Sequence, residues 1–117
     1  MKQIGEVLDR NIKLVGADAL SERGFVQVPI TIVRNNKISM GAKMVYTALL
    51  SYAWHNDFCF PGQDRMAEDI GTSRKSVNLW LQELDKSGFI KIIRRGQGKT
   101  NLYEVNLKVK VGKTRRG

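Results

Sequence analysis

The chain has 117 residues, of which 42% are hydrophobic, and a formal net charge of +9. This length suits one domain with some additional tail, and the apolar content is that of a globular protein. No stretch reaches the roughly 20 consecutive apolar residues that span a bilayer, so we expect a soluble protein without a membrane partner. The N-terminus shows no signal-peptide pattern, which predicts a cytoplasmic location.

The positive charge is confined to the C-terminal part of the chain. Residues 1–73 contain eight Lys/Arg and eight Asp/Glu, a net charge of zero, whereas residues 74–117 contain twelve Lys/Arg and three Asp/Glu, a net charge of +9. Such an excess favours a nucleic-acid partner over an anionic membrane or an acidic protein.

The sequence predicts no metal site and no cofactor. The single cysteine, Cys59, cannot form an internal disulfide, and together with the only histidine, His55, it provides too few ligands for zinc. A catalytic role for this pair would need a third polar residue to orient the histidine, and none is evident. An enzyme is therefore the least favoured class, and a buried structural cysteine is the favoured interpretation.

Residues 1–24 form an N-terminal extension, and the first regular pattern follows at residues 25–33. This segment, FVQVPITIV, has the β-branched content and alternation of a short extended segment, and Pro29 indicates an edge or irregular position. Residues 34–38 are polar, and Ser39 is a suitable N-cap for a long helix over about residues 40–55.

The helix over residues 40–55 is apolar on most of its circumference. Tyr46, Leu50 and Trp54 lie on the side opposite the main apolar stripe. Two interpretations are open: these three residues belong to the core, or they form the surface of a homodimer. The core is favoured, because an apolar helical stripe is more often core than interface.

Two further helices are separated by a three-residue turn. After a turn over residues 57–62 with a short extended piece at 58–60, the pattern predicts a helix over residues 63–70. GTS follows at 71–73, where glycine can end one helix and Ser73 can cap the next. The third helix then runs from Arg74 to about Ser87, and Gly88 is placed to stop it.

From residue 89 the apolar period changes from helical to alternating. Two β-rich runs flank RRGQGKT at residues 94–100, and two glycines in this connection predict a β-hairpin with a flexible tip. GQGKT lacks the spacing of a Walker A loop and leads into a strand rather than a helix, which argues against nucleotide hydrolysis. Residues 108–117 are interpreted as a basic tail or linker.

The third helix and the hairpin carry residues suited to duplex DNA, because a helix fits the major groove and a neighbouring hairpin can follow the backbone or minor groove. On the helix, side chains able to bond bases or phosphates are Arg74, Lys75, Ser76, Asn78 and Gln82. Around the hairpin turn they are Arg94, Arg95, Lys99, Thr100 and Asn101. The tail adds Lys108, Lys110, Lys113, Arg115 and Arg116. The alternative for the helix residues is a merely solvated amphipathic face.

The run PGQDRMAEDIGTSRKSVNLWLQELDKSGFIKIIRRGQGKTNLYEV, residues 61–105, resembles the winged helix-turn-helix domains of bacterial, plasmid and phage replication initiators, RepA-like and DnaD-like proteins included. VPITIVRNNKISMGAKMVYTALLSYA, residues 28–53, is similar to the opening segment of the same group. The helix-turn-helix part also resembles bacterial winged-helix regulators in general. Gly62 replaces a usual capping serine, and Leu79 and Trp80 stand where a polar and a small residue are common.

The resemblance implies an α+β winged helix-turn-helix domain over residues 25–107: a three-helix core with a C-terminal β-hairpin, the wing. It implies sequence-specific binding of double-stranded DNA in replication initiation, with Arg74, Lys75, Ser76 and Asn78 in the recognition helix. Arg95, Lys99 and Asn101 take wing positions. Alternatives are a transcriptional repressor and a protein-interaction winged helix in a replication assembly. For an initiator, replication proteins are expected as partners through a domain missing from this chain. Trp80 is expected to enlarge the core locally.

Overall fold

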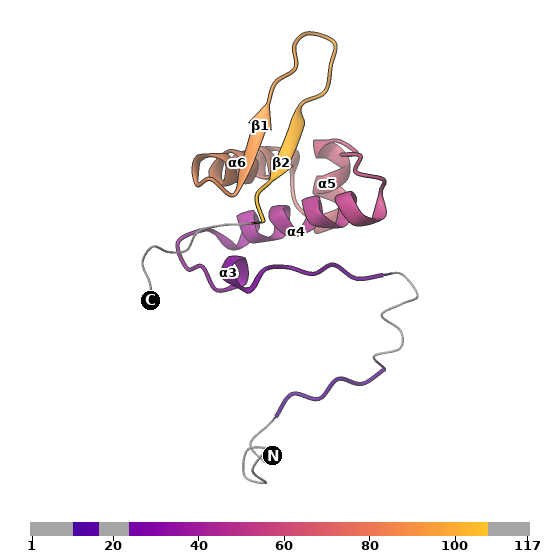
Figure 1. The fold of residues 1–117 in the computed structure, drawn as a ribbon, viewed down its shortest axis with the longest axis vertical. Helices are drawn as coiled ribbons and strands as arrows, with labels where there is room; N and C mark the ends of the chain where they lie inside the picture. The colour runs from indigo at the N-terminus through magenta and orange to yellow at the C-terminus, as the bar shows by residue number, and fades with distance from the viewer. Residues whose placement is uncertain (1–10, 17–23, 108–117) are drawn as a thin grey trace.

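The computed structural model describes residues 11–16 and 24–107. Within these residues it contains four helices and one antiparallel two-stranded hairpin (Figure 1). In chain order the elements are α3 (Ile30–Val33), α4 (Met40–His55), α5 (Gln63–Ile70), α6 (Arg74–Lys86), β1 (Ile90–Ile93) and β2 (Leu102–Val105). The α+β class and the predicted order of three main helices followed by a hairpin are confirmed.

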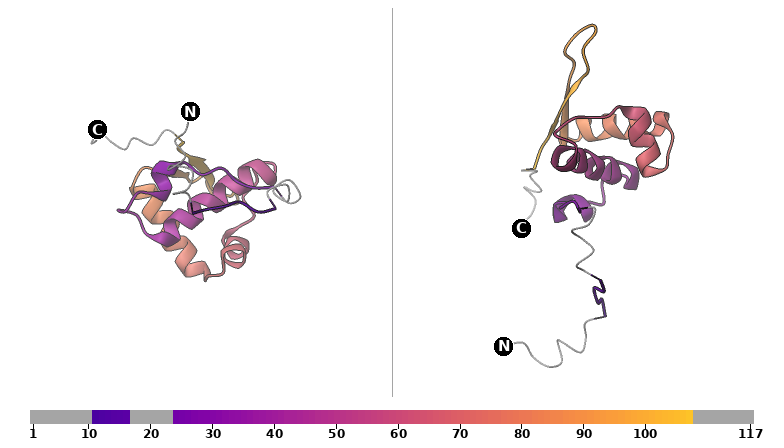
Figure 2. Two further views of the ribbon diagram at one scale, coloured as in Figure 1. Left: turned by 90° about the horizontal axis from the view of Figure 1, so that it is seen from below. Right: turned by 90° about the vertical axis from the view of Figure 1, so that its right-hand side faces the viewer.

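Helix α4 lies at the centre of the packing and contacts α5, α6 and β2. Figure 1 and the right-hand view of Figure 2 place the hairpin on one side of α4 and α3 on the other, with the hairpin tip projecting beyond the helices. The apolar circumference of α4 is explained by this position, because neighbours cover it from several directions. The buried core consists of Ile32, Ile38, Ala42, Val45, Tyr46, Ala48, Leu49, Leu50, Met66, Ala67, Val77, Leu81, Leu84, Phe89 and Ile90.

The three residues for which a core position and a homodimer surface were weighed differ in burial. Tyr46 and Leu50 are buried, as the core interpretation predicts. Trp54 is 61% exposed, so a core position for this residue was wrong. The reason is its place in the last turn of α4, beyond the buried stretch that ends at Leu50. Its ring instead lies 6.3 Å from that of Phe58, which is also exposed.

Helix ends follow the capping residues of the sequence. Ser39 accepts a hydrogen bond from the backbone N–H of Ala42, and the Glu83 carboxylate accepts bonds from the N–H and hydroxyl of Ser39 at 2.8 and 2.7 Å. Glu83 lies on α6, so this cap also joins α4 to α6. Gly71 adopts the left-handed conformation at the end of α5, and Ser73 caps α6, as predicted.

Trp80 packs against the backbone of α4 at Gly41. The indole is partly buried against the core, as expected from the sequence. A Cβ atom at position 41 would overlap the six-membered ring of this indole. The glycine therefore allows α4 and α6 to approach each other.

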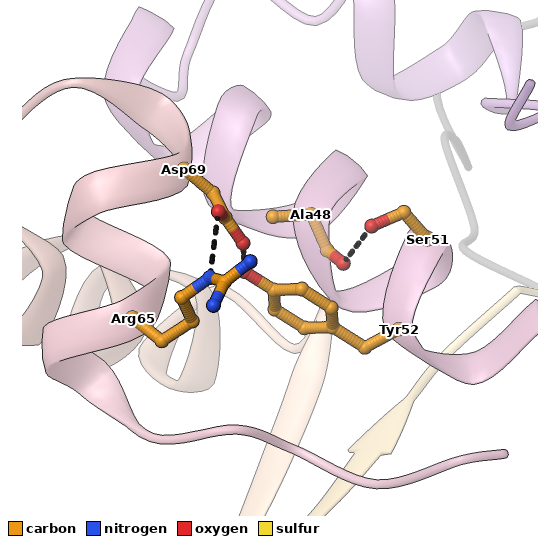
Figure 3. Close-up of polar contacts among 5 residues, drawn as sticks. All are labelled: Ala48, Ser51, Tyr52, Arg65 and Asp69. Carbon is orange, nitrogen blue, oxygen red and sulfur yellow. Dashed lines mark hydrogen bonds and ion pairs between the residues drawn. The ribbon is translucent and has the colours of Figure 1, made fainter. Parts of the chain in front are cut away.

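A polar group joins α4 to α5 beside the core (Figure 3). The Tyr52 hydroxyl donates to Oδ2 of Asp69 at 2.6 Å, and the Arg65 guanidinium donates to Oδ1 of the same carboxylate at 3.0 Å. Burial and the Asp69 hydrogen bond raise the pKa of Tyr52, so the phenol remains a donor. The hydrogen bonds from Tyr52 and then Arg65 hold the pKa of Asp69 below its usual value.

The segment at 25–33 differs from the prediction of an extended lead-in. Residues 24–29 form no regular element, and 30–33 form the short helix α3. The Pro29 carbonyl accepts bonds from the N–H groups of Ile32 and Val33, and the fixed φ of proline suits a helix start. Only Ile32 of α3 is buried, so the alternation of β-branched residues in this segment does not correspond to one face of a β-sheet.

The connection between α4 and α5 also departs from expectation. Asp57 and Phe58 have φ values of 51° and 62°, so residue 58 belongs to the turn and not to an extended piece. Cys59 is exposed, and the prediction of a buried structural cysteine was wrong. The left-handed pair turns the chain through solvent at the edge of the core, and only Phe60 of this segment packs back against it.

Among the residues that the structure describes, no helix is long and apolar enough to cross a membrane.

We expect Gly41→Ala to lower the free energy of unfolding by about 1 to 3 kcal/mol, because the new methyl group overpacks the Trp80 ring. Urea unfolding followed by far-UV circular dichroism measures this. In a Trp80→Leu background the same substitution should stabilise by about 0.5 to 1 kcal/mol, the helical preference for alanine. Equal effects in the two backgrounds would show that the indole is not the obstacle.

We expect the stability contributed by the Asp69 charge to be lost in acid. The folded-state pKa of Asp69 is lowered from 3.8, so the contribution is present above that value and declines as the pH falls through the folded value. Urea unfolding at a series of pH values should show wild type more stable than Asp69→Asn at neutral pH. The difference should shrink below about pH 4. A difference constant down to about pH 3 would contradict this assignment.

Candidate nucleic-acid interface

Helix α6 presents one polar face to solvent and one apolar face to the core. Val77, Leu81 and Leu84 are buried, which fixes the rotation of the helix about its axis. On the opposite side lie residues spaced three and four apart, which share one helical face. We call this set the recognition surface; its members are Arg74, Lys75, Asn78, Leu79 and Gln82.

The first turn of α6 borders α5. Arg74 Nη1 lies 3.3 Å from Oδ2 of Asp64, and both side chains are mostly exposed. Such an exposed pair contributes little to the free energy of folding, so the Arg74 guanidinium can leave the Asp64 carboxylate and bind another anion. A shallow hollow at this point is lined by Gln63, Arg74, Lys75, Asn78 and Leu79.

Two predicted residues of α6 are less available than the others. Ser76 is half-buried; its N–H donates to the Ser73 hydroxyl oxygen at 3.1 Å, and its own hydroxyl lies 3.1 Å from the same oxygen. Ser76 therefore takes part in the cap of α6. Gln82 is also half-buried, two turns from the start of the helix. Lys75 and Asn78 are exposed, and the cap of α6 is formed by Ser73 and Ser76 without their side chains.

The hairpin is bonded to the helices at its base. β1 and β2 pair antiparallel, with Ile90 opposite Val105 and Ile93 opposite Leu102. The buried Tyr46 hydroxyl donates to the carbonyl oxygen of Asn106 at 3.0 Å, and the N–H of Asn106 donates to the Phe89 carbonyl at 2.9 Å. Both ends of the hairpin are thus held against α4.

The hairpin loop, residues 94–101, brings together the predicted basic residues of the wing. The Arg95 guanidinium crosses the loop and donates to the carbonyl and hydroxyl oxygens of Thr100 at 2.9 and 3.2 Å. The N–H of Lys99 donates to the Gly96 carbonyl, which closes a tight turn at the tip. The side chains of Arg94 and Lys99 are exposed, and Asn101 is half-buried. Gly96 and Gly98 have positive φ values of 101° and 78°, which explains both glycines.

The predicted tail residues lie outside the described residues; they are Lys108, Lys110, Lys113, Arg115 and Arg116. Three residues of the interface were absent from the prediction. Leu79 is 58% exposed on the recognition surface, and Gln63 lines the hollow from α5. Lys86 is exposed on the same side of α6, four residues after Gln82, and this spacing could have revealed it.

The described residues give no arrangement for a metal, since no group of three or more His, Cys, Asp or Glu side chains could hold an ion there. His55 Nε2 lies 2.9 Å from the Phe25 carbonyl oxygen, which ties the segment before α3 to α4. This hydrogen bond gives His55 a structural role.

The helix pair α5–α6, with a three-residue turn between its members, matches a known family. A family model described as a helix-turn-helix domain matches residues 35–90. Residues 35–90 form a helix-turn-helix domain. The match includes α4, α5 and α6 and ends as β1 begins, and the hairpin that follows completes the predicted winged helix-turn-helix fold. A helix-turn-helix domain supports DNA binding. Neither the curated proteins nor the solved structures contain a match to the chain.

We expect Asp64→Asn to strengthen binding to duplex DNA about 1.5- to 5-fold at low salt, because it removes a negative charge beside the helix-turn-helix surface and releases Arg74. Fluorescence anisotropy with a labelled duplex measures the dissociation constant. Asp57→Asn, the same change at an exposed residue of the turn between α4 and α5, is the matched control. Unchanged affinity for Asp64→Asn, or an equal gain for the control, would contradict a local role for Asp64.

Proposed function

We propose that this protein binds double-stranded DNA in a sequence-specific manner and acts in the initiation of DNA replication. Helix α6 enters the major groove through the recognition surface, and the wing contacts the phosphate backbone. The observation that carries this proposal is the exposed first half of α6, where Arg74, Lys75 and Asn78 stand beside the hollow shared with α5. A helix fits this groove, and these side chains can bond base edges.

The distribution of charge supports duplex DNA as the partner. Residues 1–73 have a net charge of zero, and residues 74–117, which begin with α6, have a net charge of +9. Phosphate contacts by Lys and Arg release counterions and supply most of the sequence-independent affinity. Binding without catalysis is part of the proposal, since His55 Nε2 contacts the Phe25 carbonyl oxygen and the Cys59 thiol contacts the Asp57 carbonyl oxygen.

The replication role rests on the sequence resemblance of residues 28–53 and 61–105 to replication initiators. A transcriptional repressor would use the same recognition surface, so the two roles differ in where the protein binds. Mapping of its binding sites in the source cell separates them. Sites clustered within a replication origin support initiation, whereas sites spread over promoters support repression.

The direct test of DNA binding is an anisotropy titration of the chain against random-sequence duplex DNA at several salt concentrations, with a single strand of equal length as control. We expect a preference for the duplex and an affinity that falls steeply with salt. Absence of binding at low salt would contradict the proposal and favour a protein-interaction module, in which the same fold contacts replication proteins.

We expect the helix and the wing to contribute differently. Asn78→Ala should weaken binding to the preferred duplex by about 1 to 3 kcal/mol and relax sequence preference. Lys99→Ala should weaken binding to all duplexes alike and lower the salt slope by about 1. Lys99 is chosen because Arg95 also bonds Thr100, so Arg95→Ala would alter the wing itself. Selection from a random duplex pool and titrations at several salt concentrations measure both effects, and equal effects would contradict the division.

A further inference from the structure

Leu79 is the apolar member of the recognition surface. Its side chain is 58% exposed and lines the same hollow as Arg74, Lys75 and Asn78. The core does not use it, since Val77, Leu81 and Leu84 form the buried face of α6. An exposed leucine alone is unremarkable, but this one stands among the donors that face the DNA in the proposed complex.

We propose that Leu79 reads the C5 methyl group of a pyrimidine in the major groove, thymine in ordinary DNA. This inference rests on the proposed function and specifies which DNA duplexes the protein prefers. The C5 methyl group of thymine is the apolar feature of the major-groove edge. Contact between this methyl group and Leu79 removes apolar surface from water, whereas contact with a phosphate would desolvate a charged group without a hydrogen bond.

The neighbour of Leu79 points to the same base pair type. Asn78 is exposed on the recognition surface, and an asparagine can make two hydrogen bonds to the N6 and N7 atoms of adenine. Adenine N6, adenine N7 and the thymine methyl group all lie in the major groove of an A·T pair. Two consecutive residues of α6 therefore suit A·T pairs, one by hydrogen bonding and one by apolar contact.

Uracil tests this contact, because it differs from thymine only by the missing methyl group. The probes are alternating dA–dT and dA–dU duplexes of equal length, titrated by anisotropy. We expect wild type to bind the thymine duplex about 3- to 5-fold more tightly, the effect of burying one methyl group. Leu79→Ala should bind the two duplexes about equally. Met40→Ala is the matched control, because Met40 is 85% exposed on α4 outside the recognition surface, and it should keep the wild-type ratio.

A second probe pair changes the methyl group on another base. In alternating dG–dC duplexes, replacing cytosine by 5-methylcytosine adds the same group at the same position of the major groove. Wild type should gain affinity and Leu79→Ala should not. Circular dichroism verifies that Leu79→Ala is folded, as expected for an exposed position.

The outcomes separate this inference from the proposed function. Duplex binding in which wild type ignores the methyl group, or in which Leu79→Ala keeps the full preference, overturns the role of Leu79 alone. Absence of duplex binding by wild type overturns the proposed function and this inference with it. A preference that disappears in Leu79→Ala and persists in Met40→Ala supports the contact.

Discussion

One buried tyrosine determines how the helices and the wing are arranged. Tyr46 lies in the middle of α4 with no exposed surface, and its ring and that of Phe89 meet edge to face with centroids 6.5 Å apart. A phenol buried without a partner is costly, so the carbonyl of Asn106 must lie within reach of its hydroxyl. Because Phe89 precedes β1 and Asn106 follows β2, this single side chain positions both ends of the hairpin relative to α4.

The arginines of α6 and of the wing are exposed and are also held in place by other residues. Arg74 is held near Asp64, and Arg95 is held across the wing loop by Thr100, yet both guanidinium groups face solvent. Because the Arg95 guanidinium already occupies a defined position, it loses less rotamer freedom when it meets a phosphate, whereas Arg74 must first exchange the Asp64 carboxylate for that phosphate. Lys75 and Lys99 add exposed charges beside them. The exposed charges attract a phosphate backbone from a distance, and the held side chains give it a defined orientation on contact.

The elements that the sequence predicted well are those marked by capping residues and by a single apolar period. Ser39, Gly71 and Ser73 define their helix ends through local hydrogen bonds and backbone conformation, which need no knowledge of distant partners. Residues 30–33 were predicted wrongly as part of an extended lead-in, because they form the short helix α3 after Pro29. The burial of Cys59 was predicted wrongly, because burial depends on where α4 places the core and not on the local pattern.

The candidate site was predictable in type and less so in geometry. The basic and amide residues of α6 could be selected from their spacing and chemistry. Their surroundings could not: the approach of Asp64 to Arg74 and the capping role of Ser76 arise from the angle between α5 and α6 and from side-chain packing. The bond from Arg95 to Thr100 also confines the adaptable part of the wing to the few residues at its tip. When the wing binds a ligand, the conformational entropy that is lost is therefore that of the tip and not that of the whole eight-residue loop. A longer tip would lower the affinity for every ligand of the wing although no contact would be removed.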